Sequence, residues 1–439
     1  MAKKTYYGPQ TEQALHNFPF PYRPVYLELV YAIAEVKKAA ARANVSAGNL
    51  EQDISDRIEK ACDEICSGKF DDQFPTVGLQ GGAGTSIHMN VNEVIAARAE
   101  ELLHQDHISK SVHPNDHVNA SQSTNDVNPS ALRIACIRLS MELLVEVKQL
   151  ADTFRKRAEE HVATPKLART HIQDAIPTTI GAECASYEAM VVRDARRIEE
   201  AVSYLYELNL GGTAIGNSIN ASESYRKAVY RELENVVGLP VRPAQNLMAL
   251  TSNSGDVCQL SAAVTILATT LSKIALDLRF MASGPNGGIA EIQLEQLQPG
   301  SSIMPGKVNP VMPEAVNQLF YFTNGKNVTI HQAAEAGHME LAVMFPIIAD
   351  GILTVLKINT AVVRQFREKC IQTFTVDKDR CQKLLEGSTA YATLLTPVLG
   401  YDVVSKVVQE SVSTGQSIRS LIIEKGLMSE PEFDAATRI

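Results

Sequence analysis

The sequence has no tryptophan, few aromatic residues and no regular arrangement of its cysteines. Seven cysteines are scattered along 439 residues, and aromatic residues make up 6% of the chain. Only Cys62 and Cys66 lie close together, and the three residues between them do not match the spacing of a zinc-binding pair. The odd number of cysteines favours free thiols in a reducing compartment over a framework of disulfides.

The chain also lacks an excess of positive charge and a long apolar run. Its 41 Lys and Arg residues against 50 Asp and Glu residues give a net charge of −9, which argues against broad binding to nucleic acids or anionic membranes. A local cationic pocket for a small anion is still allowed. No apolar leader follows Lys3 and Lys4, and the stretch 257–272 is too short and too polar to span a membrane. We therefore expect a cytoplasmic protein whose partners include neither nucleic acid nor a membrane.

What the sequence does contain is a strong helical periodicity. Apolar side chains recur every three or four residues over 132–158 and 183–205, and the segment 256–282 is apolar nearly all round, which predicts burial among other helices. A further segment, 340–366, runs through Pro346, where we expect a kink or a break. Alternating strand patterns are nearly absent. These patterns predict an all-α protein built on a long helix bundle.

Four polar segments, rich in glycine or hydroxyl groups, lie between the helices. Gly81–Ser86 could be mistaken for a phosphate loop, but it lacks the Gly-Lys-Ser/Thr ending and no strand pattern precedes it. Ser121–Asp126 stands just before a long helix, where it is either a cap or a site for a carboxylate. The plainest reading of Arg169–Asp174 is the polar start of a helix. Gly300–Pro310 is either a tight surface turn or an anion-binding loop that holds a nucleophile or base.

Taken together, the four segments offer a consistent set of chemical groups. They supply hydroxyls, amides, one histidine and one lysine, with no metal-ligand spacing and no Cys–His pair. That set suits a small dicarboxylate, and it suits removal of a proton next to a carboxylate, where donors must face the developing negative charge. The sequence therefore predicts an enzyme for a small diacid that needs no cofactor and no metal.

The same segments carry a family resemblance. GSSIMPGKVNP at 300–310 resembles the signature of the aspartase/fumarase superfamily, and SQSTNDVNPS at 121–130, RTHIQDAIP at 169–177 and GGAGTSIHMNVNEV at 81–94 resemble its other shared blocks, in the family's order. GGAGTS, and PVMPEAVNQ at 310–318, are more similar to aspartate ammonia-lyase than to fumarase.

This resemblance implies an all-α, three-domain fold. The expected domains are an N-terminal helical domain over 1–122, a central domain of long helices over 123–378, and a small C-terminal helical domain over 379–439. It also implies a homotetramer, in which the long helices of four chains form the core and each site takes its loops from three chains.

The resemblance further implies a lyase that eliminates ammonia from L-aspartate, or a close amino-succinate, to give fumarate through an aci-carboxylate intermediate. Ser301 would be the base that takes the Cβ proton, and Glu314 would pair with a histidine such as His171. The other implied roles are α-carboxylate binding by Lys307, Asn309 and Thr170, β-carboxylate binding by Thr85, Ser123, Thr124 and Ser302, further substrate contact by Ser86, and contact with the leaving amine by Asn125 and His171. Two alternatives stay open: Asn125 as a helix cap and His171 as a residue that orients its neighbours.

Among several departures from the family pattern, two lie in or near its motif blocks. His88, which we place among the substrate-binding residues, stands where aspartases carry Asn, and Ala342 replaces an Asn that is usual in both aspartases and fumarases. Neutral drift is the plain explanation, and a pocket retuned for another substrate is the other. The alternatives to the ammonia-lyase are therefore a fumarase, a lyase for a different succinyl or amino-acid substrate, and a structural tetramer with little activity.

Overall fold

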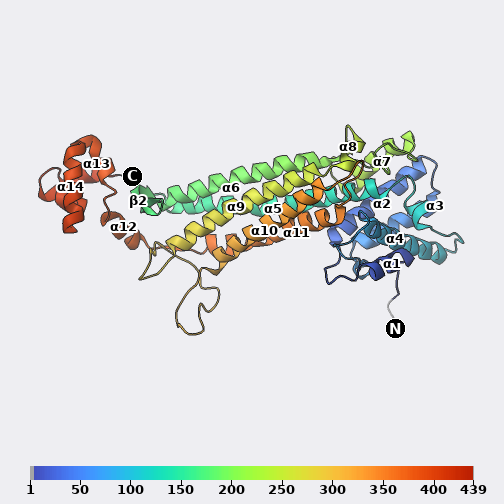
Figure 1. The fold of residues 1–439 in the computed structure, drawn as a ribbon, viewed down its shortest axis with the longest axis horizontal. Helices are drawn as coiled ribbons and strands as arrows, with labels where there is room; N and C mark the ends of the chain where they lie inside the picture. The colour runs from blue at the N-terminus through green and yellow to red at the C-terminus, as the bar shows by residue number, and fades with distance from the viewer. Residues whose placement is uncertain (1–3, 439) are drawn as a thin grey trace. The chain divides into compact units, whose positions relative to one another are not determined.

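The computed structural model describes residues 4–438, which are mainly helical, so the predicted all-α class is confirmed (Figure 1). The helices are α1 (Pro9–Asn17), α2 (Leu27–Ser46), α3 (Gln52–Cys66), α4 (Thr85–Gln105), α5 (Thr124–Glu160), α6 (Ile180–Ser203), α7 (Glu223–Val237), α8 (Leu247–Ser252), α9 (Gly255–Met281), α10 (Val311–Glu335), α11 (Phe345–Phe366), α12 (Lys378–Glu386), α13 (Ala392–Leu399), α14 (Tyr401–Thr414), α15 (Ile418–Glu424) and α16 (Glu430–Ala436). Short helical turns are η1 (Asp71–Gln73), η2 (Pro114–Val118), η3 (Tyr204–Tyr206) and η4 (Arg367–Ile371).

The strands are short and pair only in twos. β1 (Pro165–Thr170) is antiparallel to β2 (Gln173–Thr179), β3 (Glu207–Leu208) is parallel to β4 (Arg242–Pro243), and β5 (Ile292–Gln293) is antiparallel to β6 (Thr375–Val376). The hairpin of β1 and β2 corrects the plain reading of Arg169–Asp174 as the start of a helix. His171 and Ile172 have φ angles of 54° and 64°, and two such residues in a row close a two-residue hairpin turn.

The long helices follow the apolar periodicity closely, with one correction at α11. The stripes over 132–158, 183–205 and 256–282 lie in α5, α6 and α9. The fourth segment is helical only from Phe345, so residues 340–344 lie outside it. Pro346 is the second residue of the helix, where its missing N–H has no partner to lose and its fixed φ suits the first turn.

The chain divides into two compact units. The first holds the described parts of Met1–Leu144, Arg196–Ile266 and Tyr321–Asn359, and the second those of Val145–Ala195, Leu267–Phe320 and Thr360–Ile439. The points of division fall inside α5, α6, α9, α10 and α11. The three domains predicted as 1–122, 123–378 and 379–439 stay a prediction.

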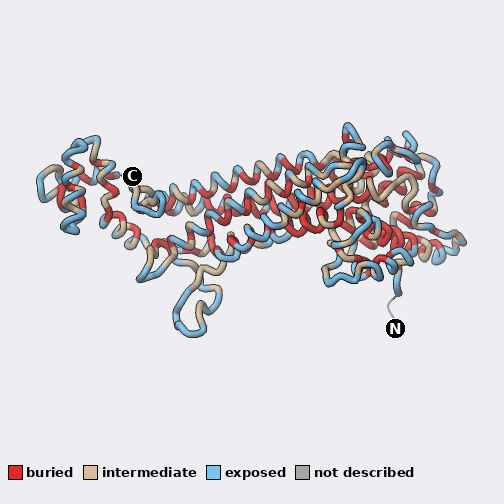
Figure 2. Tube along the Cα trace, in the orientation of Figure 1, coloured by how far each residue is buried: buried red, intermediate tan, exposed pale blue. Residues whose placement is uncertain are grey.

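In the first unit, the alanine-rich helix α2 packs against α3 and α7. Its buried residues recur along one side, where alanines such as Ala32 and Ala40 let neighbouring helices approach closely. Figure 2 shows this burial in the red stretches of α2 and α4. Two polar residues of α2, Lys37 and Asn44, are also fully buried. They lie seven residues apart, about two helical turns, and therefore on the same side of the helix.

In the second unit, the short C-terminal helices α13–α16 have a hydrophobic core of their own. Leu395, Ile422 and Phe433 lie in it, and Leu167 of β1 joins the same cluster. Helix α12 packs against β1. The change to shorter helical patterns after about residue 375 is thus present in the structure.

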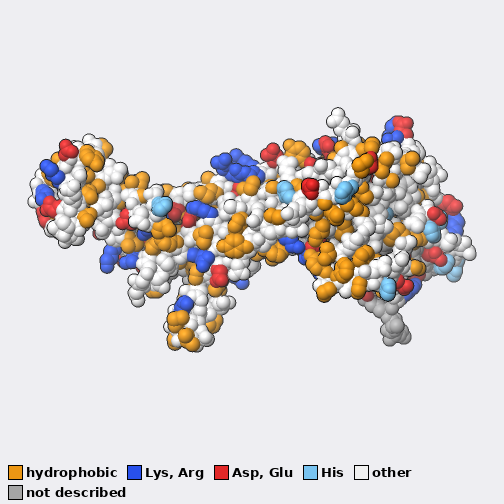
Figure 3. Space-filling view, in the orientation of Figure 1, with side chains coloured by type: hydrophobic (Ala, Val, Ile, Leu, Met, Phe, Trp, Pro, Cys, Tyr) orange, Lys and Arg blue, Asp and Glu red, His pale blue; other side chains and the backbone are white. Residues whose placement is uncertain are grey.

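The long helices keep part of their apolar surface exposed. On α9, the side chains of Ile266, Leu276 and Phe280 are exposed, so within one chain the predicted burial of this helix among others covers only part of its surface. Figure 3 shows hydrophobic side chains at several places on the surface. By length and hydropathy, Gly255–Met281 and Phe345–Ile371 could each cross a membrane, but 56% and 67% of their most apolar windows are buried inside the protein, as in a core helix.

All seven cysteines are free thiols, as predicted, and most are buried. Burial raises the pKa of Cys66, Cys136, Cys184, Cys370 and Cys381 to about 12. The reactive species of a cysteine is the thiolate, so these side chains act as packing residues.

Candidate active site

The N-terminus of α5 is held by a buried aspartate. One carboxylate oxygen of Asp126 accepts a hydrogen bond from the Ser123 N–H at 2.9 Å, and the other accepts from the N–H groups of Gly211 and Thr213 at 3.0 and 2.9 Å. Burial raises the pKa of Asp126 to about 6, although these donors and the nearby Lys37 act in the opposite direction. Asp126 thus ties the loop 211–213 to the predicted Ser123–Thr124–Asn125 cluster.

The hydroxyl and amide groups of that cluster are fixed by local hydrogen bonds. The Ser123 hydroxyl accepts from the backbone N–H of Asn125 at 3.2 Å, and the Asn125 side chain donates to the carbonyl oxygen of Ala214 at 2.7 Å. Thr124 is the first residue of α5, so its hydroxyl lies at the positive end of a 37-residue helix. This position favours a negatively charged ligand.

A buried lysine of α2 contacts the residues just before the cluster. The Lys37 ammonium group donates to the Asn119 side chain at 2.8 Å, while Asn44 donates to the carbonyl oxygen of Ala120 at 2.9 Å and accepts from the Ser121 hydroxyl at 2.7 Å. Burial lowers the pKa of Lys37 to about 7. Neither residue was predicted from the sequence, although two polar residues seven positions apart within an apolar helix were a usable signal.

The start of α4 brings a second predicted group to the same place. Thr85 is exposed, Ser86 is half-buried and His88 is buried, and His88 Nδ1 lies 2.8 Å from the Thr124 hydroxyl. Gly84 makes the approach possible: its φ is +86°, and a Cβ atom there would lie 2.7 Å from Asn128 and from Phe345. Glycine is thus required at the point where α4 meets α5 and α11.

A pocket lies beside this cluster within the first unit. Its walls include Ala83, Thr124, Asn125, Asn253, Ser254 and Ala342. The two departures at positions 88 and 342 are therefore near the predicted substrate-binding residues: Ala342 lines the pocket, and His88 contacts Thr124.

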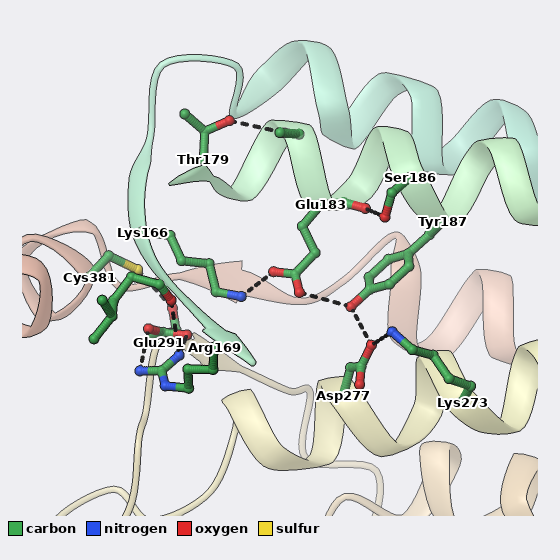
Figure 4. A network of polar contacts seen from close by, with 12 residues as sticks. Lys166, Arg169, Thr179, Glu183, Ser186, Tyr187, Lys273, Asp277, Glu291 and Cys381 are labelled. Carbon is green, nitrogen blue, oxygen red and sulfur yellow. Dashed lines mark hydrogen bonds and ion pairs between the residues drawn. The ribbon is translucent and has the colours of Figure 1, made fainter. Parts of the chain in front are cut away.

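The β1–β2 hairpin of the second unit carries Thr170 and His171 at its tip, where both are exposed. Next to the tip, a bidentate ion pair fixes the hairpin: Arg169 Nη1 donates to Glu291 Oε2 at 3.0 Å, and Nη2 lies 2.9 Å from Oε1. The Glu291 side chain is fully buried, and the Arg169 side chain is 13% exposed. Figure 4 shows the guanidinium group facing this carboxylate.

A chain of charged and hydroxyl groups continues from the hairpin into the helices (Figure 4). Lys166 of β1 pairs with Glu183 of α6, and the Tyr187 hydroxyl lies 3.1 Å from Glu183 and 2.9 Å from Asp277 of α9. Lys273 pairs with the same aspartate. This network holds the strand that leads to Thr170 and His171.

The two ends of the predicted signature loop, near residues 300 and 309, contact each other. The Asn309 side chain donates to the carbonyl oxygen of Gly300 at 2.6 Å, and a Cβ atom on Gly300 would lie 1.8 Å from the carbonyl oxygen of Lys307. The Ser301 hydroxyl accepts hydrogen bonds from the backbone N–H groups of Ile303 and Met304 at 3.2 and 3.1 Å. The segment is therefore an ordered loop that points backbone donors at one hydroxyl oxygen.

The predicted site residues thus fall into separate groups. Thr85, Ser86, His88, Ser123, Thr124 and Asn125 belong to the first unit, where the contact between His88 and Thr124 joins α4 to α5. The second unit holds two further groups: Thr170 and His171 on the hairpin, and Ser301, Ser302, Lys307, Asn309 and Glu314 on the loop and the start of α10. Ser302, Lys307 and Glu314 are exposed. Within residues 4–438, no hydrogen bond or ion pair joins Glu314 to His171, so that pairing stays a prediction.

Comparison with known proteins gives consistent matches over the whole chain. A family described as lyase matches residues 1–321, and one described as fumarase C C-terminus matches residues 392–439. The chain is 42% identical to the aspartate ammonia-lyase of Bacillus subtilis (strain 168), over 98% of this chain and 90% of that protein, and 39% identical to that of Escherichia coli (strain K12), over 98% and 91%.

Solved structures agree with the sequence comparison. A fumarate lyase:delta crystallin from Brucella melitensis bound to cobalt is similar with a TM-score of 0.95 and 38% identity, over 100% of this chain and 95% of that one. A class II fumarase from Schistosoma mansoni is similar with a TM-score of 0.93 and 33% identity, over the same shares. The chain therefore belongs to the aspartase/fumarase superfamily of lyases.

Proposed function

We propose that this lyase eliminates ammonia from L-aspartate to give fumarate. The identity of about 40% to aspartate ammonia-lyases over nearly the whole chain carries this proposal. The groups expected for such a reaction are present: hydroxyl and amide donors for two carboxylates, a lysine at position 307 and a serine whose hydroxyl accepts two backbone hydrogen bonds.

Ser301 is the proposed base. An isolated serine hydroxyl is a poor base, but the N–H groups of Ile303 and Met304 face its oxygen and would stabilise the alkoxide. The alkoxide takes the proton from Cβ, and the electron pair of the C–H bond moves into the adjacent carboxylate to form the aci-carboxylate. When that pair returns to form the double bond, the C–N bond breaks and the nitrogen leaves as ammonia with its electrons.

The two carboxylates of the substrate need different partners. Thr85, Ser123, Thr124 and Ser302 are the proposed donors around the β-carboxylate, whose negative charge doubles in the intermediate. Ser86 would make a further contact with the substrate. Lys307, Asn309 and Thr170 would bind the α-carboxylate. Asn125 and His171 would contact the leaving amine, with Glu314 paired to a histidine. The positive end of α5 supports the position given to the β-carboxylate.

We propose that the enzyme is a homotetramer whose sites each take residues from three chains. Apolar side chains left exposed on the bundle helices support this assembly, among them Val145, Ile266, Leu276 and Tyr321. Exposed apolar surface of this kind marks interfaces between proteins. We further propose a cytoplasmic location, with no membrane, nucleic acid or cofactor involved, in line with the net charge of −9 and the burial of the two most apolar helices.

A fumarase is the alternative that a specific observation favours, because the class II fumarase from Schistosoma mansoni has a TM-score of 0.93 to this chain. The purified protein should be incubated separately with L-aspartate and L-malate, and fumarate followed by its absorbance. Fumarate from aspartate alone supports the ammonia-lyase, and fumarate from malate alone supports the fumarase. No fumarate from either would point to a pocket retuned through His88 and Ala342, and a screen of amino-succinates would then identify the substrate.

A further inference from the structure

His88 and Thr124 form a contact that the proposed reaction does not by itself require. His88 Nδ1 lies 2.8 Å from the Thr124 hydroxyl oxygen, and the His88 residue is only 1% exposed. Thr124 stands at the edge of the pocket that also contains Asn125 and Ala342. The imidazole therefore reaches the pocket only through the hydroxyl of Thr124.

The imidazole is neutral at pH 7. Burial lowers the pKa of His88 well below its ordinary value, and the charge of Lys37 acts in the same direction. A neutral imidazole carries one proton, on either Nδ1 or Nε2. The Nε2 atom is buried and has no hydrogen-bond partner among residues 4–438. The location of the single proton thus decides what the Thr124 hydroxyl can do.

The two neutral forms of the imidazole ring differ in free energy. With the proton on Nε2, a buried N–H group would have no acceptor, and the Thr124 hydroxyl would use its proton to donate to Nδ1. With the proton on Nδ1, that N–H group donates to the Thr124 oxygen, and only a lone pair on Nε2 is left without a partner. Orphaned buried N–H groups are rarer in proteins than under-used acceptors, so the second form is favoured.

We propose that His88 is a positioning residue that donates its Nδ1 proton to Thr124 and so leaves the Thr124 hydroxyl proton free to point into the pocket. In that arrangement, Thr124 presents a hydrogen-bond donor to the pocket, and this donor binds a carboxylate more strongly than the neutral oxygen of an amide. The inference rests on the proposed function, because it deepens the role given there to Thr124. The positive end of α5 acts in the same direction, since it also favours a carboxylate.

Dissociation constants for two ligands test this selection. Succinate carries two carboxylates, and succinamate carries one carboxylate and one amide. Calorimetric titration of the assembled enzyme gives the ratio of their constants without any turnover. Thr124→Val removes the donor itself and should reduce the preference for succinate roughly ten- to hundredfold, since a hydrogen bond to a charged group is worth about that much. His88→Leu leaves the hydroxyl in place but no longer fixes its oxygen, so it should reduce the preference by a smaller factor. His88→Asn, whose amide N–H can take the place of Nδ1–H, should keep the ratio close to that of the parent.

A double-mutant cycle shows whether the effect passes through Thr124. Thr124→Val should lower the same ratio, and adding His88→Leu to it should change the ratio no further. An unchanged preference in His88→Leu would overturn the proposal, as would a His88→Asn variant that behaves like His88→Leu. Equal and independent effects of His88→Leu and Thr124→Val would also overturn it, because they would show a structural role alone.

A direct measurement covers the case in which His88→Leu does not assemble. Solid-state NMR of protein labelled with 13C and 15N in histidine distinguishes the two neutral forms of the ring, and the signal lost in His88→Asn identifies His88. A proton on Nδ1 supports the proposal, and a proton on Nε2 refutes it. These results are separate from the proposed function, which fails only if the parent enzyme forms no fumarate from L-aspartate.

Discussion

Removal of Arg169 should destabilise the second unit more than removal of its partner. Arg169→Met leaves the Glu291 carboxylate unpaired at a site with no exposure, and an uncompensated buried charge costs about 3–5 kcal/mol. Glu291→Gln leaves a guanidinium group that is already 13% exposed and can turn towards water, so its cost should be smaller, about 1–3 kcal/mol. The order of the two variants follows from the difference in exposure.

Unfolding in guanidinium chloride at one fixed protein concentration, followed by circular dichroism, measures these differences. The double variant Arg169→Met/Glu291→Gln removes both charges and should recover much of the lost free energy of unfolding. Lys227→Met is the matched control, because it breaks the exposed ion pair with Glu223 and should change nothing measurable. The reasoning is refuted if Arg169→Met costs less than Glu291→Gln, or if the double variant loses the sum of the two single losses.

Three further predictions concern the proposed base, the proposed carboxylate ligand and the buried lysine. Ser301→Ala should lower kcat for L-aspartate roughly 10²–10⁴-fold and leave the elution volume in size-exclusion chromatography unchanged; turnover at the parent rate would exclude Ser301 as the base. Lys307→Met should raise KM roughly ten- to hundredfold, through loss of a charge-assisted hydrogen bond, and steady-state kinetics with an unchanged KM would contradict its role. Burial lowers the pKa of Lys37 from its ordinary value of 10.5 to about 7. The free-energy cost of burying the charged ammonium group is therefore fully present below pH 7 and disappears as the pH rises towards 10.5. The melting temperature of the parent should therefore rise relative to that of Lys37→Met between pH 8 and 10, as about 1.4 kcal/mol per pH unit is regained; parallel pH curves would refute this.

The helices that build the protein could be predicted from the sequence, because their apolar stripes extend over many turns. The long stripe in α5 is an example, and the structure confirms it. The helix starts earlier than predicted, at Thr124, so Asn125 and Asp126 of the cluster lie in its first turn. The hairpin of β1 and β2 could not be predicted in this way. It has only two strands, and its tip carries the polar residues Thr170 and His171 together with the exposed Ile172, so no alternation marks it.

The candidate site was predictable as a set of residues more than as an arrangement in space. The motif loops identified Thr124 and Ser301, but part of the support for the Thr124 cluster comes from a distant part of the chain. Lys37 is the example: it donates to Asn119, and burial lowers its pKa to about 7. Burial of a charged side chain depends on how helices pack, which the sequence of one helix does not determine.

The closure of the loop at 300–309 has a consequence for how substrate binding begins. The two ends of the loop contact each other, through the Asn309 side chain and the backbone of Gly300 and Lys307. A loop closed on itself has already lost most of its conformational freedom before any ligand arrives. Ser301 and Lys307 therefore lie in one loop that is already closed before the substrate binds. Any side chain at position 300 would force the ends of this loop apart.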